Sequence, residues 1–328
     1  PCSKAPATSK KALRVGCLTP LTRAMFAMFA LVPALVPTIS MRASLRTASP
    51  TMLAPPPKRV AVVGAGIGGL ALAKALQTLD TGVEDVAVFD RRDELKPNIG
   101  GGIQINGGAA VLARLGLGEQ MKASALPVRR ILSRKSGGFE LLDIDVESLV
   151  RDEPSLVDDT GTPQAFSIMR DALQRMLADA LPAGTVRLGR KLVSIDEDKD
   201  GVNLVFDDGV SERFDLVVGA DGLSSRVRDH VEESHADGEG GAATPPTYSG
   251  IRVQFGVVPA GGVRPAGSSG EFHQWFGEGV YALTGSYGTG AADGATSDMV
   301  AVVFADPAAG ALTLTLTLAL TLTLTLTL

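Results

Sequence analysis

The chain has 328 residues and a formal net charge of −5, and 45% of its residues are hydrophobic. This length predicts about two domains of roughly 150 residues each, and the apolar fraction is ordinary for a globular protein. Seven basic residues and no acidic one precede Lys58, which leaves 24 Lys and Arg against 36 Asp and Glu in the remainder. An acidic body of this kind would repel a phosphate backbone, which argues against nucleic acid as a partner.

Residues 1–57 are predicted to be a targeting leader that is removed. The stretch AMFAMFALVPALVPTIS is broken by Pro33 and Pro37, is too short to span a bilayer, and is typical of a signal-peptide core. MRASLRTASPTMLAPPP then has the acid-free, Arg- and Ser-containing composition of an organelle transit peptide. Together they predict a bipartite plastid leader. The alternative is untranslated or wrongly joined sequence, because the chain begins at Pro1, and the protein would then be cytoplasmic.

Cysteine and histidine usage bears on disulfides and metals. Cys2 and Cys17 both lie in the leader, so the mature chain would have no disulfide, catalytic thiol or cysteine-ligated metal. His230 and His235 lie five residues apart in a charged segment without further ligand partners. We therefore expect no metal site.

The first folded element is predicted to be a strand that runs directly into a helix. RVAVVGAG, from Arg59, is a β-branched run bounded by glycine, and GGLALAKALQTL has helical spacing of its apolar residues. Gly64, Gly66 and Gly69 occupy the three positions of G-x-G-x-x-G. The first permits a tight turn, the second lets a pyrophosphate approach the backbone, and the third lets the helix pack closely on the strand. The helix N-terminus would offer N–H groups to the phosphates.

The next strand, EDVAVFD, ends at Asp90, about twenty residues beyond the third glycine. An acid at this place is expected to accept a hydrogen bond from a ribose hydroxyl and to repel a 2′-phosphate. The complete pattern predicts a dinucleotide site but does not by itself choose between NAD and FAD. In the alternative, the glycines serve only a turn and Asp90 only ends a strand.

A second strand with a glycine turn, FDLVVGADG, favours FAD. With GGGIQINGGAAVLARLGL, FSIMRDALQRML and above all GADGLSSRVR, the sequence resembles the FAD-dependent aromatic-ring hydroxylases and epoxidases, single-component flavoprotein monooxygenases related to salicylate hydroxylase and zeaxanthin epoxidase. The resemblance runs from residue 58 to about residue 309. It implies an α/β fold: a Rossmann-like FAD-binding domain of three layers, with a parallel sheet plus a β-meander, and a partial mixed β-sheet substrate domain.

The resemblance also implies the chemistry, in which NADPH or NADH reduces FAD, dioxygen forms a flavin C4a-hydroperoxide, and one oxygen atom passes to an apolar or aromatic small molecule. We identify no catalytic side chain, because this chemistry belongs to the cofactor. Loop 101–106 would pass near the flavin ring. The implied cofactor-binding residues are Gly64, Gly66 and Gly69 at the pyrophosphate, Asp90 at the adenosine ribose, Arg91 near the nucleotide, Arg170 near the cofactor, and Asp221 with Gly222 at the pyrophosphate and the reduced nicotinamide cofactor.

The predicted domains follow from these placements and from turn signals. Turns at Gly137 with Gly138, at Asp200 with Gly201 and at Asp208 with Gly209 predict β-hairpins. His273 and Trp275 belong to a predicted strand of the substrate domain, where packing is favoured over a pocket-lining role. The expected order is a leader (1–57), an FAD-binding domain (58–235) with an inserted hairpin segment near 128–165, a linker (236–246), a partial substrate domain (247–310) and a Leu-Thr repeat (311–328).

The sequence departs from the family pattern near its end. Family members carry a later glycine-aspartate motif, followed by alanine, histidine and proline, that contacts the flavin ribityl chain, and nothing like it occurs in residues 243–328. Residues 311–328 alternate Leu and Thr, a bias more typical of translated simple-sequence DNA than of a folded strand. Either the protein continues further or this is a partial domain. A non-catalytic or impaired FAD-binding fragment, and another FAD oxidoreductase such as a prenyl reductase, therefore remain alternatives. Substrate identity, oligomeric state and membrane contact stay open.

Overall fold

The structure is a computed structural model that describes residues 56–96, 100–151, 153–158, 161–234, 246–260, 269–291 and 293–306. These residues belong to one compact unit, Pro55–Leu328. The leader up to residue 55, nearly all of the expected linker and the Leu-Thr repeat lie outside the described residues, so their roles stay predictions. Among the helices in the described ranges, none is both long and apolar enough to cross a bilayer.

A parallel four-stranded sheet carries the glycine turn. Val60 and Val62 of its first strand are fully buried, as expected for a short apolar run covered on both faces. Val60 pairs with Leu216 in parallel, so the second glycine strand returns beside the first, as predicted. In spatial order the strands are β12 (Leu216–Gly219), β1 (Arg59–Val63), β2 (Asp85–Phe89) and β8 (Val186–Arg187).

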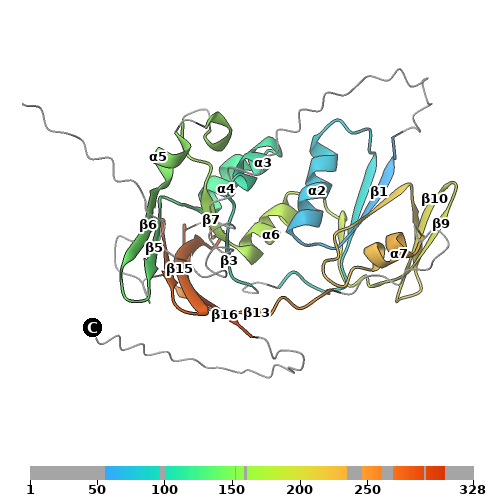
Figure 1. The fold of residues 1–328 in the computed structure, drawn as a ribbon. Coiled ribbons are helices and arrows are strands. Elements are labelled where there is room, and N and C mark those ends of the chain that lie inside the picture. Colours follow the sequence, from blue (N-terminus) through green and yellow to red (C-terminus); the bar gives the residue numbers. More distant parts are fainter. Residues whose placement is uncertain are drawn as a thin grey trace, which may run out of the picture. The chain divides into compact units, whose positions relative to one another are not determined.

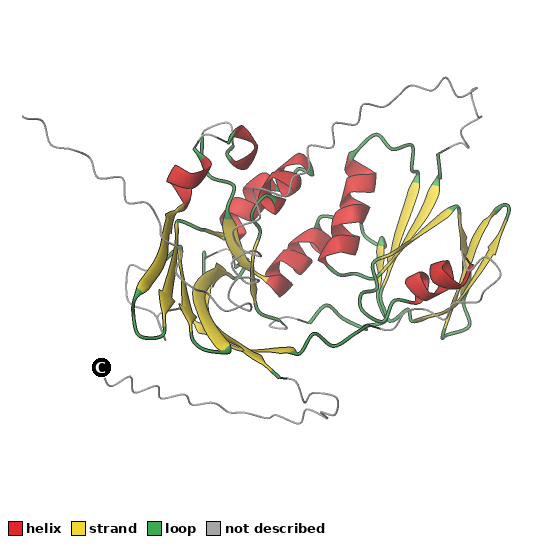
Figure 2. Ribbon diagram, viewed as in Figure 1, coloured by secondary structure: helices red, strands yellow, loops and turns green. Residues whose placement is uncertain are grey.

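One layer covers each face of this sheet (Figures 1 and 2). Val62 shares a core with Leu70 and Leu177 of the helices α2 (Ile67–Thr78) and α6 (Arg170–Asp179). On the other face, the Phe89 ring lies 4.6 Å from that of Phe206, centroid to centroid. The predicted three-layer α/β architecture, with a parallel sheet plus a β-meander, is confirmed. The second layer comprises β9 (Leu192–Asp198), β10 (Gly201–Phe206), β11 (Ser211–Phe214) and helix α7 (Arg226–Ser234).

A nine-stranded mixed sheet is the third sheet of the described residues (Figure 1). Its main path runs β13 (Ile251–Pro259), β16 (Thr296–Ala305), β15 (Val280–Gly288), β14 (Glu271–Phe276), β5 (Arg130–Lys135) and β6 (Glu140–Asp145). Three short strands, β3 (Gly102–Gln104), β4 (Leu126–Pro127) and β7 (Phe166–Met169), join it beside this path. The short helices are α3 (Gly108–Arg114), α4 (Gly118–Ser124), α5 (Val146–Val150) and a 3₁₀ turn at Pro154–Leu156.

The helices join the two sheets through a shared core. In Figure 1, α4 and α6 lie between β7 of the mixed sheet and α2. Leu70 of α2, Met121 of α4 and Tyr287 of β15 belong to the same buried cluster. The parallel sheet and the mixed sheet are therefore held by continuous apolar packing.

The hairpin near residues 128–165 has the predicted turn between β5 and β6, but its place in the fold was not predicted. Strand β5 pairs in parallel with β14, with Arg130 opposite Glu271, so the hairpin extends the mixed sheet. The segment is inserted among the FAD-binding elements in sequence and belongs in space to the other sheet. The domain boundaries themselves stay a prediction.

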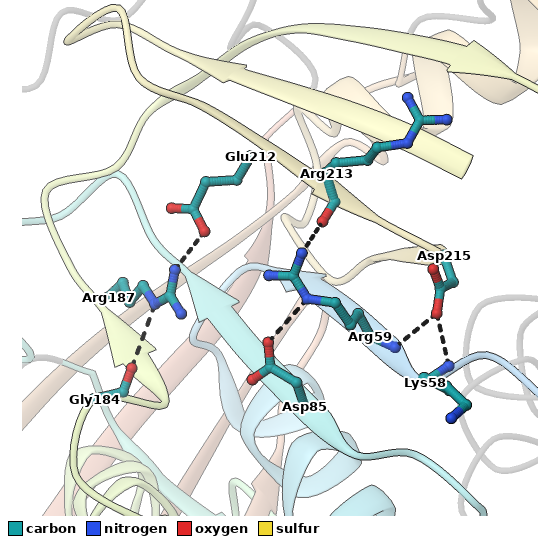
Figure 3. Close-up of polar contacts among 8 residues, drawn as sticks. All are labelled: Lys58, Arg59, Asp85, Gly184, Arg187, Glu212, Arg213 and Asp215. Carbon is teal, nitrogen blue, oxygen red and sulfur yellow. Dashed lines mark hydrogen bonds and ion pairs between the residues drawn. The ribbon is translucent and has the colours of Figure 1, made fainter. Parts of the chain in front are cut away.

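Charged side chains tie the amino-terminal end of the parallel sheet together (Figure 3). One Asp215 carboxylate oxygen accepts hydrogen bonds from the backbone N–H groups of Lys58 and Arg59, at 2.7 and 2.9 Å. The Arg59 guanidinium donates to Asp85 and to the carbonyl oxygen of Arg213. These exposed contacts contribute little stability each. They occupy the amino ends of the strands, whereas the glycine turn lies at the carboxyl end.

Candidate functional site

Two of the three motif glycines are required by packing. Gly64, directly after β1, has φ +113°, and a Cβ there would lie 2.3 Å from the carbonyl oxygen of Ala220. A Cβ on Gly69 would lie 2.0 Å from the carbonyl oxygen of Gly64. The first glycine thus permits the turn against β12, and the third lets α2 approach the turn. Any larger residue at either place would force the backbone apart.

Gly66 is a glycine for a different reason. Its backbone is extended, with φ −76° and ψ 175°, and no atom lies within 4 Å of a Cβ placed there. It precedes α2, whose first turn has neither a side-chain cap nor an acidic residue. The first N–H groups of a helix have no partner inside the helix, so this end is suited to an anion. The space beside Gly66 is free for a ligand.

A cavity of about 500 Å³ opens at this helix end, a size typical of small-molecule sites. It lies at the carboxyl ends of the parallel strands, where ligands bind in open α/β sheets. Gly69 is not part of its wall, because it is buried between α2 and the turn. The sequence-predicted residues that line the cavity are Gly64, Gly66, Asp90, Arg91, Arg170, Asp221 and Gly222.

Asp90 is buried at the end of β2 and is held by donors of the chain itself. Its carboxylate accepts hydrogen bonds from the Ala65 N–H at 2.8 Å and from the Arg92 N–H at 2.9 Å. The Arg92 guanidinium adds two more, at 2.9 and 2.8 Å. Burial raises the pKa of Asp90, but the Arg92 and Ala65 hydrogen bonds outweigh it and hold that pKa below its usual value.

Asp221 is also engaged by the chain. Its carboxylate accepts from the Ser225 hydroxyl and from the backbone N–H of Arg226, the latter at 2.7 Å. It therefore caps the amino end of α7 while lining the cavity. Gly222, next to it, is exposed, with φ +82°.

Basic side chains dominate the cavity wall. Arg91, Lys191 and Arg226 are exposed, whereas the two acids of the wall, Asp90 and Asp221, are both engaged with donors of the chain. This arrangement favours an anionic ligand such as a pyrophosphate, so the residues present fit the phosphate part of FAD. The basic residues of the wall are Arg91, Arg92, Arg170, Arg190, Lys191 and Arg226.

Sequence reasoning missed part of this wall. Arg190 and Lys191 stand between β8 and β9 without a local motif, and only the order β12-β1-β2-β8 brings them to the glycine turn. Ser224 and Arg226 lie inside GADGLSSRVR, but the motif predicts no role for them. Arg190 is paired with Asp208, which reduces its free charge.

The loop expected near a flavin ring packs on the mixed sheet. The Gly102 N–H lies 3.1 Å from the sulfur of Met299, and a Cβ on Gly102 would overlap the Tyr287 ring. Because glycine has no side chain, the loop can pack directly against Met299 and Tyr287. A position of this loop near a flavin ring stays a prediction.

His273 and Trp275 lie on the opposite face of β14 from Phe272, because side chains alternate along a strand. Phe272 faces the core, where its ring lies 5.4 Å from that of Tyr287. His273 contacts Glu271 at 3.0 Å, and its ring lies 5.5 Å from that of Trp275. This geometry favours the packing role over the pocket-lining one.

Comparison with known proteins decides the family. The sequence profile described as FAD binding domain matches residues 58–247, more than half of the chain. The chain belongs to this family. The match begins directly before β1 and ends before β13, and the resemblance predicted from the motifs is confirmed.

Individual proteins that are similar in sequence or structure include FAD-dependent enzymes, in agreement with the family match. The 3-amino-4-hydroxybenzoate 2-monooxygenase of Streptomyces cremeus is 36% identical over 204 residues, which cover 62% of this chain and 46% of the relative. The FAD-dependent urate hydroxylase of Klebsiella pneumoniae is 34% identical over 171 residues, 52% of this chain and 42% of the relative. The crystal structure of Klebsiella pneumoniae HpxO complexed with FAD and uric acid has a TM-score of 0.62 and 26% identity, covering 78% of this chain and 58% of that one. The chain spans about half the length of the curated relatives it matches.

Proposed function

We propose that this chain binds FAD at the glycine turn and acts as an FAD-dependent monooxygenase that uses NADPH or NADH. Its substrate would be a small aromatic or apolar molecule. The observation that carries the proposal is the basic cavity at the uncapped end of α2, at the carboxyl ends of the parallel strands. The relatives named as hydroxylases and monooxygenases support the reaction class.

The chain's own residues would bind and orient the cofactor. The N–H groups at the start of α2 would bind the pyrophosphate beside Gly66, and the exposed Arg91 and Arg226 would add charge. Arg170 reaches the same cavity from α6. When bound, FAD supplies hydride acceptance and dioxygen activation. Because four donors of the chain already fill the Asp90 carboxylate, a hydrogen bond from the ribose would require Arg92 to give up part of its contact.

Replacing Gly66 by valine tests the cofactor site. A Cβ at residue 66 lies within 4 Å of no protein atom, and the backbone there is one that L-residues adopt, so the fold should persist. The valine side chain would fill the space for the pyrophosphate. We expect the purified variant to lose bound flavin in its absorption spectrum and to keep the wild-type melting temperature. Gly68→Ala is the matched control, because Gly68 is exposed, also has free space, and does not line the cavity. Equal flavin content in Gly66→Val and wild type would contradict the assignment.

A second candidate is an FAD-binding fragment without turnover, for which the cavity residues alone would suffice. The discriminating measurement is oxidation of NADPH or NADH by the flavin-loaded protein, with hydroxybenzoates and urate as trial substrates. Retained flavin with no oxidation in any condition would favour the fragment.

A further inference from the structure

The peptide groups on both sides of Ala65 are fixed by side chains from two different elements. The Ala65 N–H donates to the buried carboxylate of Asp90 at 2.8 Å. The Ala65 carbonyl oxygen accepts a hydrogen bond from the side-chain amide of Gln174 and a longer one, at 3.4 Å, from Arg92. Ala65 is the middle residue of Gly64-Ala65-Gly66, so these contacts act on the turn itself.

Gln174 comes from α6 and is 4% exposed. It lies one helical turn after Arg170, so both side chains project from the same face of α6. Arg170 reaches the cavity, whereas Gln174 stands behind the glycine turn. Gln174 lies inside FSIMRDALQRML, but no local pattern predicts its role, because its partner lies 109 positions away.

Peptide geometry gives this contact a directional consequence. The described chain has no cis peptide, and in a trans peptide the C=O and the following N–H point in opposite directions. When Gln174 binds the Ala65 carbonyl, the N–H of Gly66 is turned the opposite way, and Gly66 lines the cavity. The hydrogen bond from Gln174 to the Ala65 carbonyl thus orients the Gly66 N–H on the cavity side of the turn.

We propose that Gln174 is a positioning residue that holds the Ala65–Gly66 peptide so that the Gly66 N–H faces a bound pyrophosphate. The proposal rests on the proposed function, because it assigns the cavity to a dinucleotide. Gln174 itself touches the protein backbone and acts on the ligand only through the turn. Asp90 acts in the same way on the preceding peptide, through the Ala65 N–H.

Two variants separate this role from simple packing. Gln174→Met keeps the length of the side chain and removes the donor, and Gln174→Glu keeps the shape as well. Gln174 also lines a second, smaller cavity of about 270 Å³ together with Arg92 and Arg170, and their positive charges favour the ionised form of the new carboxyl, which cannot donate. Gln164→Met is the matched control, since Gln164 is equally buried, at 5%, and donates to the Thr162 carbonyl away from the cavity.

The decisive measurement is FAD affinity by titration of flavin fluorescence. We expect Kd to rise about tenfold in Gln174→Met and Gln174→Glu, and to stay at the wild-type value in Gln164→Met. The deficit of Gln174→Glu should shrink as the pH is lowered and the carboxyl regains a proton to donate. Wild-type affinity in Gln174→Met would overturn the proposal, because packing of a side chain without a donor would then suffice.

A flavin-free readout separates this inference from the proposed function. In the apoprotein, hydrogen–deuterium exchange of the Gly66 amide region should be faster in Gln174→Met than in wild type and unchanged in Gln164→Met. If the wild type retains no FAD, the proposed function fails, and the exchange result still decides whether Gln174 orders the turn. Unchanged exchange in Gln174→Met would refute the positioning role.

Discussion

Asp90 shows how one residue serves the turn and the cavity at once. A carboxylate has about four acceptor positions, and Ala65 and Arg92 fill them in this structure. The motif predicts that the acid at the end of β2 accepts a hydrogen bond from a ribose hydroxyl. No local pattern predicts that Arg92, two residues later, folds back onto the same carboxylate.

Replacing Asp90 by asparagine should destabilise the protein by about 1–2 kcal/mol at neutral pH, because the buried carboxylate would lose its charge and with it the ion pair to Arg92. Since the pKa of Asp90 is lowered in the folded state, its contribution is present above its unfolded pKa and is lost as the pH falls through the folded value. In urea unfolding, the free energy of unfolding of Asp90→Asn should therefore lie well below that of the wild type at pH 7, and this difference should become smaller below about pH 4.

Asp196→Asn on β9 serves as the control for that series, because Asp196 is exposed and its substitution should leave stability nearly unchanged at either pH. If the loss of unfolding free energy in Asp90→Asn were the same at neutral and acid pH, lost packing and not lost charge would explain the destabilisation.

Helix α2 packs closely against the turn after β1 because glycines stand at the contact. The strand, turn and helix were predictable because their signals are local: a β-branched run, spaced glycines and helical periodicity. The place of the β5–β6 hairpin was not, because Ser133 of β5 binds Gln274 of β14 across 141 positions, and no local pattern encodes a partner so far away.

Gly69→Ala should lower the melting temperature clearly, because the added Cβ would lie 2.0 Å from the Gly64 carbonyl oxygen and backbone would have to move. Overpacking of this kind costs about 1–3 kcal/mol. Thermal unfolding by circular dichroism measures it. Gly68→Ala, one position earlier on the exposed side of α2, should be neutral or slightly stabilising, since alanine favours a helix. Equal melting temperatures for the two variants would show that α2 shifts freely.

At the scale of the whole molecule, strand β13 presents apolar side chains at the end of the mixed sheet. Ile251 and Val253 are each 54% exposed and Phe255 is 49% exposed, and β13 is the terminal strand of the sheet path. Exposed apolar residues on an edge strand favour association between molecules.

The double substitution Ile251→Lys with Val253→Lys should therefore raise solubility and reduce light scattering of concentrated protein. Gln254→Lys adds a charge to the same strand without removing apolar surface, because residue 254 lies on the other face. An equal gain from Gln254→Lys would indicate that net charge, and not the apolar strip, controls association.

A chain trimmed to residues 56–306 should retain as much flavin as the full chain. The residues that line the cavity lie between Val63 and Arg226, so none of them belongs to either trimmed segment. Flavin content per protein and melting temperature measure the outcome. A marked loss of flavin on trimming would show that the leader or the Leu-Thr repeat supports the site, against our prediction for both.

The pairing of β1 with β12 has a consequence for biosynthesis. The Arg59 N–H finds its partner Asp215 156 positions later, and Asp221 and Arg226 of the cavity wall follow still further on. When only the glycine turn and β2 have been synthesised, the cavity-lining residues up to Arg92 are present and those from Arg170 to Arg226 are not. Capture of the cofactor has to wait until translation has passed Arg226 and that segment has left the exit tunnel, so a ribosome stalled before that point leaves a nascent chain that cannot hold its flavin.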